Sequence, residues 1–337
     1  MYNTYNGGFY YAPPQLSPSN IEAKQLKKDG NYVGVILLLL ALFMQFSFTI
    51  VVHILMFFGV VSAQSVNENY LGLDNTRYLF VYAVVYILLM GVPAVLASVL
   101  CGRTRNPFSP CKPISGGILF LGLVGAVGLC MVSNIVTTYL KMFMSEWGVP
   151  IPEFPSLMEN TWTSYALNLF VIAILPALLE EMVFRGYILQ TLRRYGDGFA
   201  VLLSAFWFGL MHGNVVQVPF AFLVGLVMGW LYVVTENIWI PILIHFFNNA
   251  ISVTMEFITL NMTDAITGVF YSLCIYGLAF LGVVAIVSLL VFYHRQLHSK
   301  NQIQTLSFGQ RFSTILRAPI YTIAAIVYIL LLVKELF

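Results

Sequence analysis

Charge is the scarcest property of this sequence. Only 9% of its 337 residues are Asp, Glu, Lys or Arg, whereas a soluble domain carries about 25%. Hydrophobic residues make up 59% of the chain, and its mean hydropathy is +0.85. So few charges cannot cover a globular surface, which excludes a soluble enzyme, a nucleic-acid-binding protein and a disordered chain. We therefore expect a membrane protein that contacts lipid and no nucleic acid.

Several catalytic signatures are missing as well. The four cysteines have neither the spacing of a metal site nor that of a secreted disulfide framework. The sequence contains no HExxH motif of a helix-borne zinc protease and no GxSxG motif of a serine hydrolase. Its Gly196-Asp197 pair lies in a basic loop without a second intramembrane Asp. That pair is typical of a turn and argues against an aspartyl intramembrane protease.

Long apolar runs fill most of the chain. A membrane-spanning helix needs about 20 mostly apolar residues, and the first such run covers residues 31–64. Further runs cover 78–101, 115–140, 161–192, 198–212, 215–235, 238–257 and 266–293, and a short one covers 318–333. The pattern predicts an all-α, polytopic transmembrane helix bundle with about eight spans. The number is nine if the short run crosses the membrane instead of lying at its interface.

Basic residues collect on one side of this alternating topology. Three of the sixteen Lys and Arg residues, Arg77, Lys141 and Lys334, fall on the other side, and Arg185 falls inside a run. The remaining twelve share one side: Lys24, Lys27, Lys28, Arg103, Arg105, Lys112, Arg193, Arg194, Arg295, Lys300, Arg311 and Arg317. Because cytoplasmic loops carry the excess of Lys and Arg, we expect a multi-pass protein of the cell membrane with a cytoplasmic N-terminus.

The run 161–192 contains three charges, Glu180, Glu181 and Arg185. A charge near the bilayer centre costs about 2.5–3.5 kcal/mol, so charges there suggest a function. Glu181 and Arg185 are four residues apart, which lets them pair on a helix. Glu180 is turned by about 100° from Glu181 and can face elsewhere, as a general base would. The plainer interpretation is that these residues only hold helices together.

Two later runs add polar side chains that can act with Glu180. His212 ends the run 198–212, and His245 and Asn249 share one face of the run 238–257 at a spacing of four. Counted from the expected cytoplasmic ends, these groups lie at depths where they can meet. A carboxylate, two imidazoles and an amide are sufficient to activate water and to stabilise an oxyanion.

Three short motifs resemble those of a known family. Glu180 to Arg185 reads EEMVFR and resembles the EExxxR motif of the CPBP family. This family includes CAAX prenyl protease 2 and the bacteriocin-processing (Abi) intramembrane proteases. Residues 208–212 resemble its FxxxH motif and residues 245–249 its HxxxN motif. In the family pattern, Glu181 and Arg185 correspond to a structural ion pair.

The resemblance implies an intramembrane endopeptidase with a site open toward the cytoplasm. Glu180 would be the base that activates water, assisted by His212, and His245 and Asn249 would be the oxyanion donors. The family is commonly labelled a metalloprotease, and Glu180, His212 and His245 would supply three ligands of a catalytic zinc ion. The same groups can hold a water without metal. The spacing leaves both forms open, and we favour the form without metal.

The resemblance also implies partners and a division of the chain. The substrate would be a membrane-associated or prenylated (CAAX-like) protein or peptide, and bacteriocin immunity is a further role of bacterial members. Residues 1–30 are expected to be a disordered cytoplasmic tail and 31–142 to form three spans. Residues 143–257 would form the CPBP/Abi catalytic core, and 258–337 the C-terminal spans and a cytoplasmic loop.

Two other classes of protein fit parts of the sequence. A non-catalytic immunity or scaffold protein could retain the fold, but it would not need to keep all four candidate catalytic residues. A small transporter or proton relay also carries Glu and His within its spans. That function would be favoured by an internal repeat or by paired broken helices, and the sequence shows neither.

Overall fold

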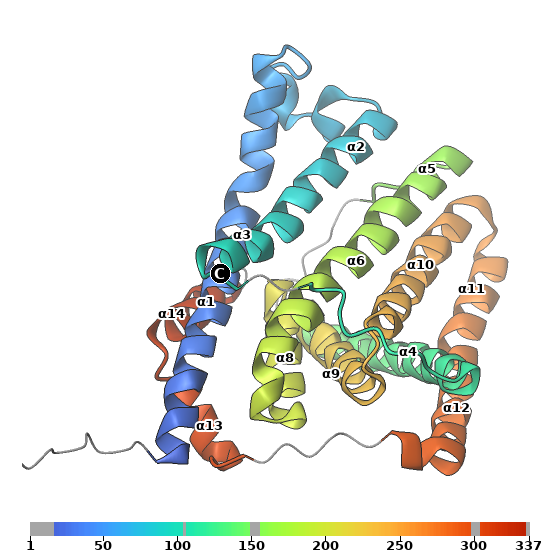
Figure 1. The fold of residues 1–337 in the computed structure, drawn as a ribbon. Helices are drawn as coiled ribbons and strands as arrows, with labels where there is room; N and C mark the ends of the chain where they lie inside the picture. The colour runs from blue at the N-terminus through green and yellow to red at the C-terminus, as the bar shows by residue number, and fades with distance from the viewer. Residues whose placement is uncertain (1–16, 104–105, 149–155, 298–303, 335–337) are drawn as a thin grey trace, which may run out of the picture.

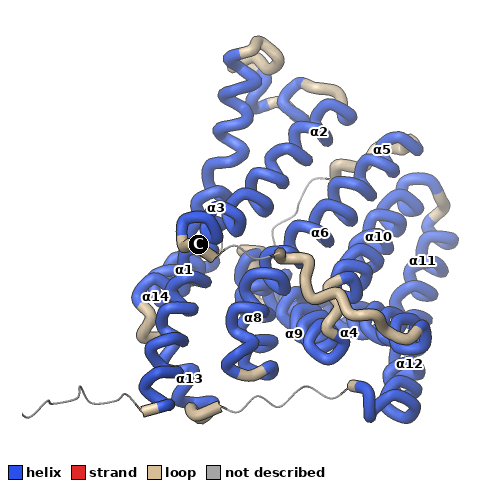
Figure 2. The backbone as a smooth tube through the Cα atoms, viewed as in Figure 1, coloured by secondary structure: helices blue, strands red, loops and turns tan. Residues whose placement is uncertain are grey.

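A computed structural model of the chain describes residues 17–103, 106–148, 156–297 and 304–334. Apart from one isolated bridge between Cys111 and Asn237, the regular structure in these ranges is entirely helical (Figure 2). Residues 1–16 of the expected disordered tail (residues 1–30) lie outside the described residues. Residues 18–30 belong instead to the first helix, because Ser17 caps it and Pro18 follows at its first turn.

The structure contains fourteen α-helical stretches in its described ranges. They are α1 (Pro18–Phe57), α2 (Asn75–Tyr86), α3 (Val92–Leu100), α4 (Gly116–Glu146), α5 (Trp162–Asn168), α6 (Leu175–Glu181), α7 (Gln190–Leu192), α8 (Asp197–Met211), α9 (Gln217–Thr235), α10 (Trp239–Asn261), α11 (Asp264–Ser272), α12 (Leu278–Tyr293), α13 (Phe308–Ile315) and α14 (Pro319–Lys334). Four π-helical segments continue these stretches: η3 (Ile87–Gly91), η4 (Leu169–Ile174), η5 (Met182–Leu189) and η7 (Leu273–Gly277). The remaining short segments are the 3₁₀ turns η1 (Ser65–Asn67), η2 (Asn69–Gly72), η6 (Arg193–Tyr195) and η8 (His294–Gln296).

The described helices confirm a polytopic helix bundle. Seven continuous helical stretches are long and apolar enough to cross a membrane, and there are eight if α13 and α14 form one bent span. The predicted run 198–212 becomes α8, a helix of only 15 residues. The short run 318–333 becomes α14, which follows α13 at a bend of 80°. The chain is therefore an integral, multi-pass membrane protein.

The helices surround a central group that carries the candidate site (Figure 1). Helix α1 forms one side of the molecule, with α2–α3 along its later part and α13–α14 along its earlier part. The opposite side is formed by α11–α12, and α6, α8, α9 and α10 lie between. The beginning of α1, the end of α12 and α13 lie at the same end of the molecule, which is consistent with the alternating topology expected from the basic residues.

Close helix packing depends on a few small residues. A Cβ built on Gly128 of α4 would lie 2.4 Å from the Cα of Gly282 on α12, so these helices touch through their backbones. A Cβ on Gly34 of α1 would lie 2.5 Å from the backbone nitrogen of Tyr321 on α14. Small residues permit such approaches between membrane helices, where lipid and side chains are equally apolar.

The largest buried cluster of side chains lies around α6, η5 and α8. Trp207 of α8 is fully buried and donates a hydrogen bond to the hydroxyl of Tyr321 at 2.9 Å. Phe184 packs edge-on against Phe208 with ring centroids 5.3 Å apart. The cluster packs η5 against α8 and α9, and α8 against α14.

Candidate active site

The helix of the candidate site changes from π to α geometry next to Pro176 and continues without a break. Proline has no N–H, so it cannot donate to the carbonyl four residues earlier, that of Ile172. Helix η4 ends just before this point, and α6 begins there with proline in its first turn. The Asn249 amide of α10 donates a hydrogen bond to the Ile172 carbonyl at 2.9 Å. Helix α10 is thus linked to the carbonyl one turn before Pro176.

The Glu181–Arg185 pair forms as the spacing predicts. Both residues are fully buried, and Arg185 Nη1 donates to Glu181 Oε1 at 2.9 Å. Arg185 Nη2 donates to the carbonyl of Gly225 on α9 at 3.2 Å, and the guanidinium lies 4.6 Å from the ring centre of Phe208. The pair therefore links η5 to both α9 and α8.

His245 of α10 lies between the two glutamates. Its Nδ1 is 2.9 Å from Glu181 Oε1, the oxygen that also accepts from Arg185. Because an ionised carboxylate only accepts hydrogen bonds, Nδ1 carries the proton of that bond. The other ring nitrogen, Nε2, is 4.0 Å from Glu180 Oε2. Glu181 therefore orients the imidazole so that Nε2 faces the second carboxylate.

Glu180 is buried, and its two oxygens have different surroundings. Oε1 accepts a hydrogen bond from the hydroxyl of Tyr86, at the end of α2. Oε2 makes no hydrogen bond with any residue in the described ranges. One water can bridge Oε2 and His245 Nε2, since polar groups separated by more than 3.5 Å are commonly joined that way. The arrangement can thus hold a water between a base and an imidazole.

His212 is near this group but is not hydrogen-bonded to it. It ends α8, and its Nδ1 bonds to the carbonyl of Phe208 at 2.8 Å. Its ring packs edge-on against Phe208, as does that of His245, with centroids 5.2 and 5.8 Å away. Within the described ranges, His212 makes no hydrogen bond or ion pair with Glu180 or His245.

The two asparagines that follow His245 are joined to each other. Asn248 Nδ2 donates to Asn249 Oδ1 at 3.1 Å, while Asn249 Nδ2 donates to Ile172 as described above. An amide nitrogen carries two hydrogens, so Asn249 retains one for another acceptor. Asn248 is buried, and its Oδ1 has no hydrogen-bond partner in the part of the chain that the structure describes.

The predicted zinc ligands are not assembled as a ligand set. Among the described residues, no three His, Cys, Asp or Glu side chains are grouped so that they could hold one metal ion. Glu180 and His245 face each other, but His212 is bonded to a backbone carbonyl. These residues do not fit a zinc ion as they stand, and no step below is derived through a metal.

Tyr86 is the contact of the site that the sequence did not reveal. It belongs to a different predicted span from Glu180 and stacks on Tyr82, with centroids 6.2 Å apart. Two tyrosines four residues apart in an apolar run indicate only that they share a helix face. Nothing in the sequence links that face to the glutamates, because the contact is made by packing between distant spans.

The comparisons with known proteins concern the segment that carries this site. Residues 162–251 match the family model described as type II CAAX prenyl endopeptidase Rce1-like. That segment includes every residue of the three motifs. Over this segment the chain is similar to the CPBP family. It is also 25% identical over 223 residues to YdiL of Bacillus subtilis (strain 168), which is named as a membrane peptidase.

The similarity to YdiL covers 65% of this chain and 87% of YdiL. No solved structure matches the chain. The family match and this relative support the same general class, a membrane peptidase of the CPBP kind.

Proposed function

We propose that this protein is an intramembrane endopeptidase in which Glu180 activates a water molecule for attack on a peptide bond. The observation that carries the proposal is the asymmetry of the Glu180 carboxylate. Tyr86 holds Oε1, and Oε2 lies 4.0 Å from His245 Nε2. A general base must reach the proton that it removes, directly or through one water. Water held by Oε2 and Nε2 meets that condition.

The remaining polar groups support the later steps of hydrolysis. Glu180 takes a proton from the water while the hydroxide attacks the carbonyl carbon, and the carbonyl oxygen becomes an oxyanion. The spare amide hydrogen of Asn249 is an available donor for that oxyanion. His245 can donate through Nε2 when both of its ring nitrogens carry a proton. Glu180 then returns the proton to the amine that leaves.

Glu181 and Arg185 are positioning residues in this scheme. The carboxylate of Glu181 fixes the orientation of the His245 ring, and Arg185 neutralises that carboxylate in a fully buried position. His212 is proposed to assist by its position against Phe208, the ring that also contacts His245. Its imidazole would have to turn from the backbone carbonyl before it could contact the water.

The proposed substrate is a membrane-associated or prenylated, CAAX-like protein or peptide. The description of the matching family model, which names CAAX prenyl endopeptidases, supports this class. The basic segments at the start of α1 and around α13 support a cytoplasmic N-terminus, on the side where prenylated proteins reside. The buried position of Glu180 supports cleavage of a segment that enters the helix bundle.

The test is a comparison of peptide termini in the host by mass spectrometry. Cells that lack the protein would be rescued at matched levels with the wild-type chain, Glu180→Ala or Glu146→Ala. Glu146 is exposed at the end of α4 and serves as the control for removing a carboxylate. We expect a new terminus with the wild type and the control but not with Glu180→Ala. Identical termini in all three rescues, where loss of the protein has a phenotype, would favour a non-catalytic scaffold.

A further inference from the structure

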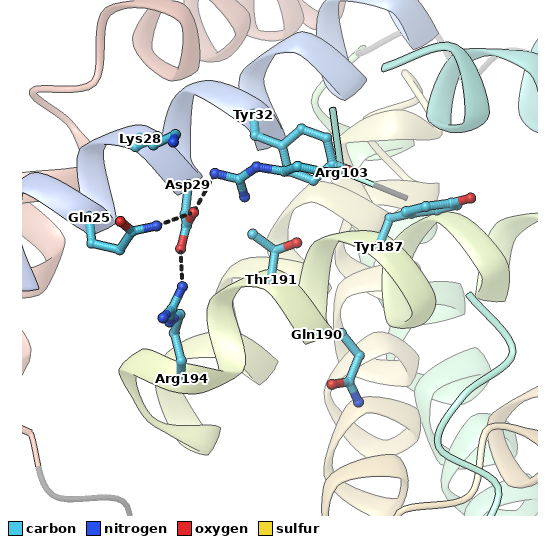
Figure 3. Close-up of a pocket in the computed structure, with 9 residues that line it drawn as sticks. All are labelled: Gln25, Lys28, Asp29, Tyr32, Arg103, Tyr187, Gln190, Thr191 and Arg194. Atoms are coloured by element: carbon cyan, nitrogen blue, oxygen red, sulfur yellow. Dashed lines mark hydrogen bonds and ion pairs between the residues drawn. The ribbon is translucent and has the colours of Figure 1, made fainter. Parts of the chain in front are cut away.

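A second polar site lies away from the glutamate pair. A cavity of about 420 Å³ separates the first part of α1 from the helix that continues past η5 (Figure 3). Its charged lining consists of Lys28 and Asp29 from α1, Arg103 from the loop after α3, and Arg194 from η6. Three cations and one carboxylate leave this lining with an excess of two positive charges.

The carboxylate in this cavity is already used by the protein. Asp29 is 1% exposed, and Arg103 Nη2 lies 2.6 Å from its Oδ1. Its Oδ2 accepts from the hydroxyl of Tyr195 at 2.6 Å and lies 3.5 Å from Arg194 Nη1. Gln25 donates a further hydrogen bond to Oδ1 at 3.2 Å. Because its acceptor sites are occupied, Asp29 offers nothing to a cationic ligand, and the cavity favours an anion.

Donors for an anion remain on both walls of the cavity. Arg103 uses one of its five N–H groups for Asp29 and stacks over the ring of Tyr32 at 4.6 Å, which fixes the plane of the guanidinium. Lys28 is exposed at the rim. On the opposite wall the hydroxyl of Thr191 makes no hydrogen bond with any described residue, although Thr191 is buried.

The position of the cavity indicates that the anion comes from a lipid. The uncharged run of α1 begins directly after Asp29, and η6 with Arg194 ends the apolar stretch Trp162–Tyr195. Both walls of the cavity therefore lie where apolar spans reach the membrane surface. Lipid phosphates concentrate at that level, and basic pockets between membrane helices bind anionic headgroups.

We propose that this cavity binds the phosphate of an anionic phospholipid headgroup. The headgroup would contact Lys28 on α1 and Thr191 and Arg194 on the other wall. One lipid would thus hold α1 against the helix that continues from Glu180. Binding is expected to stabilise the folded protein, because a ligand that binds only the folded state shifts the unfolding equilibrium. This proposal does not depend on peptidase activity.

The test uses the purified full chain in a neutral detergent and measures lipid binding by native mass spectrometry. Phosphatidylglycerol, phosphatidylcholine and inorganic phosphate are titrated separately. We compare the wild type with K28Q/R194Q and with K24Q/K27Q, which removes two neighbouring charges of α1 that lie outside the cavity lining. We expect phosphatidylglycerol to bind more tightly than phosphatidylcholine and to raise the melting temperature. K28Q/R194Q should weaken this binding at least tenfold, while K24Q/K27Q should retain it.

Thr191→Val is the second variant, since it alters the site without changing charge. Loss of one hydrogen bond should weaken headgroup binding about threefold to tenfold. If K28Q/R194Q and K24Q/K27Q weaken lipid binding equally, the lipid is held by general electrostatic attraction to the basic surface, and the proposal is overturned. If inorganic phosphate binds and stabilises the protein as well as phosphatidylglycerol does, the cavity binds free phosphate, and the assignment to a lipid headgroup is overturned. Unchanged lipid binding, together with a raised KM of K28Q/R194Q for a peptide with a free C-terminal carboxylate, would assign the cavity to substrate.

Discussion

Replacement of Arg185 by Met is the most direct test of how the glutamate pair is held. Arg185 has no exposed surface, and its guanidinium contacts Glu181 at 2.9 Å and the Gly225 carbonyl at 3.2 Å. Met fills a similar volume without charge, so the variant leaves the buried Glu181 carboxyl with His245 as its remaining partner. Breaking a buried ion pair from one side costs about 3–5 kcal/mol. Glu181→Gln, which leaves Arg185 unpaired, should cost a similar amount.

The double variant Glu181→Gln/Arg185→Met tests whether each single variant loses stability because it leaves one buried charge unpaired or because it loses a favourable interaction. Glu181 Oε2 and Arg185 Nε have no hydrogen-bond partners in the described structure, so the pair itself is incompletely satisfied. When both charges are removed, the main loss is the donor to the Gly225 carbonyl, worth about 1–3 kcal/mol. We therefore expect Glu181→Gln/Arg185→Met to be more stable than either single variant.

The assay is denaturation of the purified protein in mixed detergent, followed by tryptophan fluorescence. The control is the exposed Arg77–Asp74 pair at 3.1 Å, whose single neutralisations should each change stability by less than about 1 kcal/mol. Additive costs in the buried pair would refute the argument. They would mean that each residue acts through other contacts and that the charges do not depend on each other.

Three further predictions concern the surroundings of the site. Tyr86→Phe removes a hydrogen bond to the proposed base, worth about 1.5–3 kcal/mol. It should lower kcat about 10- to 100-fold and also lower the melting temperature, because the buried Glu180 Oε1 loses its donor; Tyr82→Phe should retain activity in the same peptide assay. Asn249→Ala leaves the Ile172 carbonyl without its side-chain donor and should lower stability by about 1–3 kcal/mol in detergent denaturation as well as lowering activity; an unchanged stability would assign the amide to the substrate alone. Gly128→Ala places a Cβ against a neighbouring backbone and should cost about 1–3 kcal/mol, whereas Gly277→Ala meets open space and should be tolerated in the same thermal melts.

Much of the fold could be predicted because bilayer insertion depends on local composition. Apolar runs and their charged ends indicated a helical bundle, and the count of spans differs only where a run is short or bent. The apolar run 198–212 already indicated a short helix, observed as the 15-residue α8, whereas the 80° bend between α13 and α14 was not predictable from hydropathy. Such a bend depends on how neighbouring helices pack against the segment, which local hydropathy does not report.

In the candidate site, too, some features followed from the sequence and others from the packing of distant helices. The sequence alone determined that Glu181 and Arg185 can pair, since both lie on one helix at a spacing of four. It also determined that Glu180 faces a different direction. Only the tertiary structure decided the partners of Glu180, because Tyr86 and His245 come from α2 and α10, far along the chain. Contacts within a helix follow from its 3.6-residue period, whereas contacts between helices depend on the packing of whole surfaces.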